Sequence, residues 1–136
     1  MNSKVKRIIN ILYSITGTYN PFIIAELLNI DVHYKNLGGH PLGHCSKILK
    51  ETVIVLDSSL VDSPIRFFIC AHELCHAIKH SDIASYYSLN ELSKGKLEYE
   101  ADIFAFELIK LLFSIELTEE SITDEMANDY GINFIN

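Results

Sequence analysis

The stretch His72-Glu73-Leu74-Cys75-His76 lies inside a long apolar segment, residues 64–80, whose pattern predicts a helix. Ser63 and Pro64 suit the cap and the first turn of that helix. Because the two histidines stand four residues apart, their side chains project from one helix face and their imidazoles can meet at one point. Two neutral imidazoles at this spacing supply two corners of a tetrahedral zinc site.

Glu73 follows the first histidine directly, which brings its carboxylate beside the predicted metal. A carboxylate there can take a proton from a metal-bound water, so the motif predicts Glu73 as the catalytic base. The motif alone is moderately specific, and the alternative is a helix with two partly exposed histidines and a solvated glutamate. A purely structural metal site has no use for a base at this position.

A catalytic zinc ion keeps three protein ligands and one open position, so a third ligand must come from elsewhere. The best candidate is Glu98, at the start of the next apolar helix, which we predict over residues 97–113. Asp102 lies one turn later on the same face and can accept a hydrogen bond from the second nitrogen of a zinc-bound histidine. Glu100 points away from this face and is expected to be solvated.

Several residues after the motif are weaker candidates. Asp82 has the spacing of the third ligand in metzincins, but Lys79 stands where those proteins need a glycine. His80 extends the histidine face by one turn and is interpreted as a helix-end residue that can line the cleft. Tyr86 and Tyr87, together with His80, are candidates for stabilising an oxyanion, and simple packing is the alternative for both tyrosines.

The remaining pattern predicts one α+β domain over residues 1–136, with N-terminal helices, a small β-sheet and then the motif helix packed on a second helix. The expected elements are helices over residues 3–15 and 22–28, a strand over 30–37, a hairpin with arms 45–49 and 52–56, the two helices above, a mainly irregular segment over 81–95 and a weaker acidic helix over 118–129. Asn20 and Pro21 provide a cap and a first-turn proline for the second helix. The second hairpin arm is either an edge strand for an extended substrate or a core strand, and its consecutive apolar residues favour the core.

Composition narrows the class of protein further. The chain has 136 residues and a formal net charge of −7, which disfavours direct binding to nucleic acid. Its three cysteines (Cys45, Cys70 and Cys75) follow no C-x-x-C spacing, which fits a reducing compartment and a cytoplasmic location. We expect Cys70 and Cys75 to be small buried side chains of the motif helix. No apolar run is long enough to cross a bilayer.

Two segments, residues 71–78 and residues 98–105, resemble the ImmA/IrrE family of zinc metallopeptidases, and the resemblance extends to residues 20–30 and 54–60. It implies a compact α+β domain of the minimal gluzincin kind. It also implies Zn²⁺ bound by His72, His76 and Glu98, with Glu73 as the catalytic glutamate. The implied partner is a protein substrate, a helix-turn-helix transcriptional repressor of a phage or integrative element that is cut at one site. The chain departs from the family where it reads Leu111-Leu112-Phe113-Ser114 without a proline.

Three rival functions stay open at this point. The chain could be a non-catalytic, zinc-stabilised regulator that binds a protein without cutting it. It could be a DNA-binding regulator, which its acidity disfavours. It could also be a protease that acts on other host proteins. Coordination distinguishes the first rival from a protease, because four protein ligands indicate a structural zinc site and three with an open position indicate a catalytic one.

Overall fold

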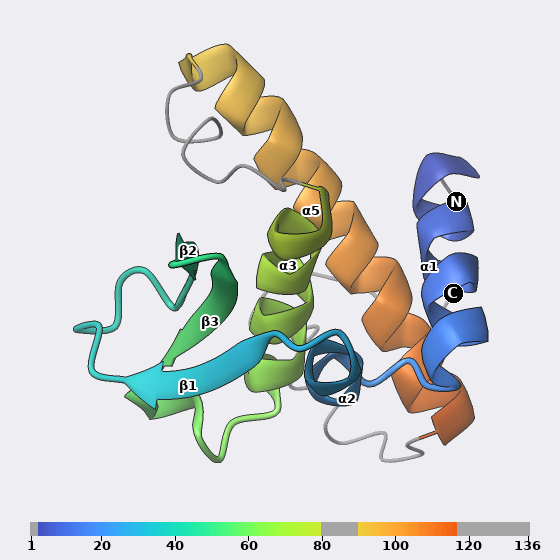
Figure 1. Cartoon of the computed structure of the whole chain (residues 1–136), viewed down its shortest axis with the longest axis horizontal. Helices are drawn as coiled ribbons and strands as arrows, with labels where there is room; N and C mark the ends of the chain where they lie inside the picture. The colour runs from blue at the N-terminus through green and yellow to red at the C-terminus, as the bar shows by residue number, and fades with distance from the viewer. Residues whose placement is uncertain (1–2, 80–89, 117–136) are drawn as a thin grey trace.

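The computed structural model describes residues 3–79 and 90–116 (Figure 1). The elements in chain order are α1 (Ser3–Thr16), α2 (Pro21–Leu27), β1 (Asp31–Lys35), β2 (Gly43–Ile48), β3 (Glu51–Asp57), the short helix η1 (Ser58–Leu60), α3 (Ile65–Lys79), α5 (Glu91–Leu111) and the π-helical segment η2 (Leu112–Glu116). The predicted α+β class is confirmed. The helix predicted over residues 118–129 lies outside the described residues.

The small sheet has the strand order β1-β3-β2. β1 runs parallel to β3, with Asp31 opposite Val53, and β2 runs antiparallel to β3, with Gly43 opposite Leu56. β3 is therefore the central strand, and both of its hydrogen-bonding edges are occupied. This confirms the core interpretation of the second hairpin arm, because a substrate strand has no free edge on β3 to pair with.

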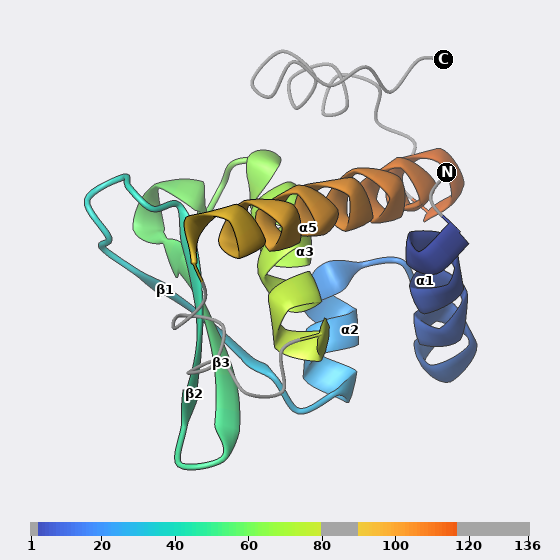
Figure 2. The same ribbon diagram turned by 90° about the horizontal axis from the view of Figure 1, so that it is seen from above.

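α3 lies between the sheet and α5, as the two perpendicular views agree (Figures 1 and 2). On one side it packs on the inward face of the sheet, which contributes the fully buried Ile54 and Leu56. On the other side it packs on α5, whose Phe104 and Leu108 are also fully buried. The helix that carries the histidine motif is thus held in the centre of the core.

The predicted N-terminal helix caps are present. The Asn20 side chain accepts a hydrogen bond from the Phe22 amide at 2.9 Å, and Pro21 opens α2. At the start of α3 the Ser63 hydroxyl accepts a hydrogen bond from the Ile65 amide at 3.3 Å. Such caps satisfy backbone donors that have no partner within the helix.

The start of α5 differs from the prediction. The sequence was expected to stay mainly irregular up to residue 95 and to form a helix from residue 97, but α5 begins at Glu91. Asn90 caps it by accepting a hydrogen bond from the Ser93 amide at 2.8 Å. Glu98 therefore lies well inside a regular helix rather than at its fraying end, so its backbone position is fixed by helical hydrogen bonds on both sides.

The described part of the chain contains no single helix that is both long enough and apolar enough to cross a membrane. By length and composition alone, α1 and α2 taken together reach that threshold, with a bend of 64° between them. The apolar face of α1, formed by Val5, Ile9 and Leu12, is buried in the protein core.

Asp57 organises the loop that leads into β2. Its carboxylate accepts hydrogen bonds from the amides of Leu37 at 2.7 Å and Gly39 at 3.3 Å, and also from the amide and the hydroxyl of Ser59. The hydrogen bonds from Ser59 and Leu37 hold the pKa of Asp57 at about 2, below its ordinary value of 3.8. The ionised carboxylate therefore stabilises this loop.

We expect Asp57→Asn to destabilise the protein at neutral pH, with the difference from the wild type shrinking in acid. A pKa that is lower in the folded state contributes stability that is complete above pH 3.8 and is lost as the pH falls toward 2. Urea unfolding of both proteins between pH 2 and pH 7 measures this. An Asp57→Asn difference that stays constant over the whole range would contradict the assignment.

Candidate metal centre

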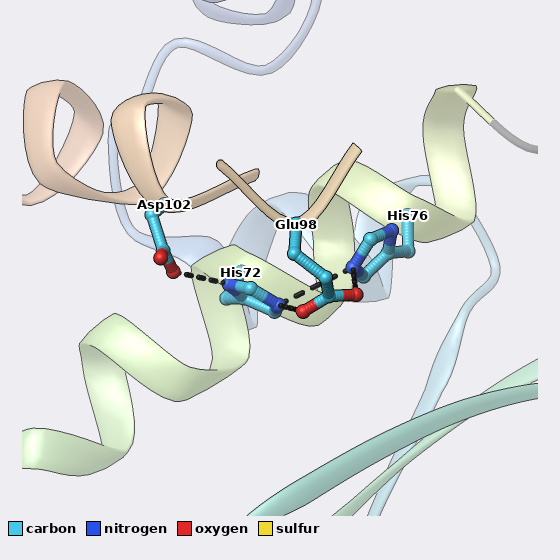
Figure 3. Close-up of polar contacts among 4 residues, drawn as sticks. All are labelled: His72, His76, Glu98 and Asp102. Carbon is cyan, nitrogen blue, oxygen red and sulfur yellow. Dashed lines mark hydrogen bonds and ion pairs between the residues drawn. The ribbon is translucent and has the colours of Figure 1, made fainter. Parts of the chain in front are cut away.

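Three side chains from α3 and α5 converge on one point. The Nε2 atoms of His72 and His76 are 3.2 Å apart, and the Glu98 carboxylate lies 3.0 Å from the first and 2.8 Å from the second. Figure 3 shows the carboxylate facing both imidazoles across the gap between the two helices. Together these side chains form a group whose candidate ligand atoms all lie within 4.8 Å of one another.

The donor set and its spacing fit a tetrahedral metal ion. Zinc bonds of about 2.0–2.1 Å separate neighbouring ligand atoms in a tetrahedron by about 3.3 Å, close to the distances between these atoms. Two imidazole nitrogens and one carboxylate oxygen are also a ligand set that zinc accepts at catalytic sites. Within residues 3–79 and 90–116 the group has three such side chains, which leaves a fourth tetrahedral position without a described protein ligand.

The two helices that carry these side chains pack on each other, and both contribute small residues to the buried core. Ala71 on α3 and Ala101 and Ala105 on α5 are all fully buried in the core. The separation of two packed helices depends on the side chains between them, so alanines permit a close approach. The rings of His72 and His76 lie edge to face, with centroids 4.9 Å apart.

Asp102 binds the other side of the His72 ring. Its Oδ1 lies 2.8 Å from His72 Nδ1, while His72 Nε2 faces Glu98 (Figure 3). With a proton on Nδ1 donated to Asp102, the lone pair of Nε2 is available to a metal ion. The contact between Asp102 and His72 Nδ1 is thus the one that the sequence predicts. The role of Asp102 in metal binding remains a prediction.

We expect Asp102→Asn to weaken zinc binding by about 10- to 100-fold, because a neutral amide orients the His72 ring less firmly and makes it less basic. The Asp102 side chain is 57% exposed, so the change should leave the fold intact. Competition titration with a chromophoric chelator measures the affinity. Asp31→Asn, at an exposed position of β1 away from the site, is the matched control. Equal zinc affinities for Asp102→Asn and the control would remove Asp102 from the site.

The acidic groups around His72 make this position favourable for a cation. Burial lowers the pKa of His72, but hydrogen bonds with Asp102 and Glu98 and the nearby charge of Glu73 outweigh burial and raise it to about 10. A position that stabilises a positive charge on an imidazole also suits a bound metal ion, and a metal must then displace a proton to bind. The electrostatics therefore agree with the ligand geometry.

The Glu73 side chain, on α3, reaches the sheet. It approaches the backbone of Gly43 at the start of β2, and the residue is only 9% exposed. Burial raises the pKa of the Glu73 carboxyl, and the neighbouring His72 and His76 partly oppose that shift. A raised pKa makes a carboxylate a stronger base, which is the direction that a proton acceptor needs.

Glu100 is not the solvated residue that was expected. Its side chain is 23% exposed and forms ion pairs with Lys79 at the end of α3 and with Lys4 of α1, the latter at 3.8 Å. Burial, together with the nearby Lys4, lowers the pKa of Lys79. These pairs tie α1, α3 and α5 together next to the candidate site. The spacing within α5 could not predict them, because both partners come from other helices.

Four other candidates fall outside the described residues. Tyr86 and Tyr87, predicted to stabilise an oxyanion, belong to this group, as do His80 and the alternative third ligand Asp82. The predicted cysteine environment, by contrast, is confirmed. Cys70 and Cys75 are buried in α3, and none of the three cysteines forms a disulfide.

The comparison with protein families agrees with the site. Residues 25–130 match a peptidase family described as the IrrE N-terminal-like domain. This match covers both α3 and α5 and most of the chain. The protein belongs to this family, which confirms the ImmA/IrrE resemblance read from the sequence.

A curated relative points in the same direction. The chain is 34% identical over 94 residues to a protein of Bacillus phage phi105 named "Uncharacterized immunity region protein 2". The aligned segment covers 68% of this chain and 59% of the phage protein, so the chain spans somewhat more than half the length of that relative. No solved structure matches the chain.

Proposed function

We propose that this protein is a zinc-dependent endopeptidase in which His72, His76 and Glu98 hold the metal and Glu73 is the general base. The observation that carries the proposal is the convergence of the two Nε2 atoms and the Glu98 carboxylate within 4.8 Å, with the buried Glu73 carboxyl on the same helix. Membership in a peptidase family supports the reaction class.

The chemistry divides between the metal and the residues of the chain. When bound, zinc supplies a Lewis acid that polarises the scissile carbonyl and lowers the pKa of water. The Glu73 carboxylate accepts the proton of the attacking water and passes it to the leaving amine. Asp102 holds His72 through its Nδ1 proton. Tyr86 and Tyr87 remain the candidates for stabilising the oxyanion.

The openness of the site supports a protein substrate. The two histidines are largely buried, with side chains 14% and 8% exposed, whereas the side chain of Glu98 is 46% exposed. These exposures support a metal held by the two buried histidines and open to solvent beside Glu98. β2, which lies next to Glu73, forms an edge of the sheet in the described part of the chain. An extended segment of another protein can pair with such an edge.

We propose a transcriptional repressor of a phage or integrative element as the substrate, cut at one site in the cytoplasm. The name of the phage relative, an immunity region protein, supports this choice, because it refers to the region of a phage that carries immunity functions. The net charge of −7 supports a protein substrate over a nucleic acid. The three buried cysteines, none of which forms a disulfide, are consistent with a reducing compartment.

The proposal is tested by incubating the zinc-loaded protein with the repressor encoded by a neighbouring gene and identifying the products by mass spectrometry. We expect one new pair of termini with the wild type, and an intact repressor with the chelated protein or with Glu73→Gln. If Glu73→Gln generates the same termini at the wild-type rate, the assignment of Glu73 is wrong. An intact repressor that forms a stable complex with the wild type would instead support a non-catalytic regulator.

A further inference from the structure

Gly43, the first residue of β2, faces α3 at the level of Glu73. A Cβ atom added at Gly43 would lie 2.6 Å from Ile69 Cγ2, 3.1 Å from Glu73 Cγ and 3.3 Å from Glu73 Oε2. A real Cβ atom does not approach another heavy atom as closely as 2.6 Å, so a side chain here would force its neighbours to move. Because Gly43 has no side chain, there is room beside it for the side chains of Glu73 and Ile69.

Space, rather than backbone conformation, distinguishes Gly43 from the other described glycines. Gly17, Gly38 and Gly39 have φ angles of +73°, +76° and +80°, and a Cβ at any of them would meet nothing within 4 Å. Those positions use the conformational freedom of glycine. Gly43 has no such positive φ, so its backbone accepts any residue and only the contact with Ile69 and Glu73 disfavours a side chain.

Other features of the structure hold Gly43 at this position. Its strand register is fixed opposite Leu56 of β3, and the preceding carbonyl, that of Leu42, accepts a hydrogen bond from the Asp57 amide at 2.8 Å. Because side chains alternate along a strand, Cys45 faces α3 together with Gly43, and the charge of Glu73 reaches the Cys45 thiol. The Glu73 side chain is therefore enclosed between its own helix and a well-anchored strand.

We propose that Gly43 is a positioning residue for Glu73, an inference that rests on the proposed peptidase function. The bare backbone of β2 lets the Glu73 carboxylate lie beside the histidine pair, and a side chain at Gly43 displaces it. The three heavy atoms nearest to a Cβ at Gly43 belong to Ile69 and Glu73 and not to the candidate metal ligands, so Gly43 acts on the reaction through Glu73. Its effect therefore appears in proton transfer and not in metal binding.

Gly43→Ala is expected to lower kcat by about 10- to 100-fold, because small misplacements of a catalytic group are costly to the rate. Zinc affinity should stay within about threefold of the wild-type value, since His72, His76 and Glu98 keep their contacts. KM should change little, because proton transfer to Glu73 stabilises mainly the transition state and not the bound substrate. Gly95→Ala is the matched control, because a Cβ at that helical glycine would meet nothing within 4 Å.

A double variant separates positioning from packing. Ile69→Ala removes the methyl group at 2.6 Å but leaves the contact between the new Cβ and Glu73. Gly43→Ala combined with Ile69→Ala should therefore unfold at a higher temperature than Gly43→Ala alone, while its kcat remains low. Recovery of wild-type kcat in the double variant would show that Gly43 only relieves a clash with Ile69, and would overturn the proposal.

Crystal structures of the zinc-loaded wild type, Gly43→Ala and the double variant test the proposal without any substrate. We expect the Glu73 carboxylate of both variants to be displaced relative to the ring of His72, with the metal ligands in place. A Glu73 side chain that keeps its wild-type position in the double variant would overturn the inference. If the wild type cleaves no protein at all, the peptidase proposal fails, whereas the position of Glu73 in these structures still decides the role of Gly43.

Discussion

Glu73→Gln is expected to reduce peptide-bond cleavage by about 100- to 10,000-fold, the range that positioned general acids and bases contribute. Glutamine keeps the shape of the side chain and fits the same buried space between α3 and Gly43. It cannot accept a proton at neutral pH, so the loss should fall on kcat. The Glu73 side chain is not part of the group of candidate ligand atoms, so zinc affinity should stay close to the wild-type value.

Rates and affinities must be measured on the same preparation. Cleavage of a peptide that spans the identified bond gives kcat and KM, and chelator competition gives the zinc affinity. Glu107→Gln is a suitable control, because Glu107 is another buried glutamate of the described chain and pairs with Lys110 away from the histidines. A Glu73→Gln protein that has also lost its zinc would mean that Glu73 is a ligand rather than a base.

Glu98→Ala is expected to weaken zinc binding by more than the 10- to 100-fold anticipated for Asp102→Asn, because it removes a direct contact rather than a supporting one. Glu98 is the partner of both imidazoles, at 3.0 and 2.8 Å, and its loss leaves two ligands from a single helix. Two ligands do not complete the set of three that catalytic zinc sites use. Peptidase activity should be lost together with the metal.

Thermal unfolding with and without zinc provides a direct measurement of this effect. A ligand present at 100 times its dissociation constant stabilises the folded state by about 2.7 kcal/mol, so zinc should raise the Tm of the wild type and not that of Glu98→Ala. Glu91→Ala is the matched control, because this glutamate of the same helix has a side chain that is 96% exposed. An equal zinc-dependent increase in Tm for Glu98→Ala and Glu91→Ala would exclude Glu98 as a ligand.

Helical spacing explains how much of the candidate site could be predicted from the sequence. His72 with His76 and Glu98 with Asp102 are pairs four residues apart, and the helical period alone places each pair on one face. The structure brings these four side chains together, with Asp102 on the far side of the His72 ring. Their roles as metal ligands and as a supporting carboxylate stay predictions until a metal is observed.

Features that depend on neighbours distant in the sequence could not be predicted. The contacts of Gly43 with Glu73, and of Glu100 with Lys79 and Lys4, join elements whose relative positions no local pattern encodes. Gly43 follows a run of turn residues and looks like one more loop glycine. An alternating pattern likewise predicts β1 as a strand, but it does not say that β1 pairs in parallel with β3.

Local signals failed at two places for identifiable reasons. Ser93 and Gly95 have low helix propensity, so the sequence pattern did not predict the first turn of α5. In the structure, the Asn90 cap and the packing of the helix determine where α5 begins. The turn between β2 and β3 uses Leu49 and Lys50 at φ angles of +49° and +73°, where hairpins usually have asparagine or glycine. The arms were nevertheless predicted to within two residues, because their β-branched and apolar residues define them.

The most direct test of the central claim is a crystal structure of the full chain with zinc bound. We predict one zinc ion with His72 Nε2, His76 Nε2 and a Glu98 carboxylate oxygen as its three protein ligands, and a fourth position open to solvent or substrate. Zinc bound elsewhere on the protein, or closed off by a fourth protein ligand, would contradict the account.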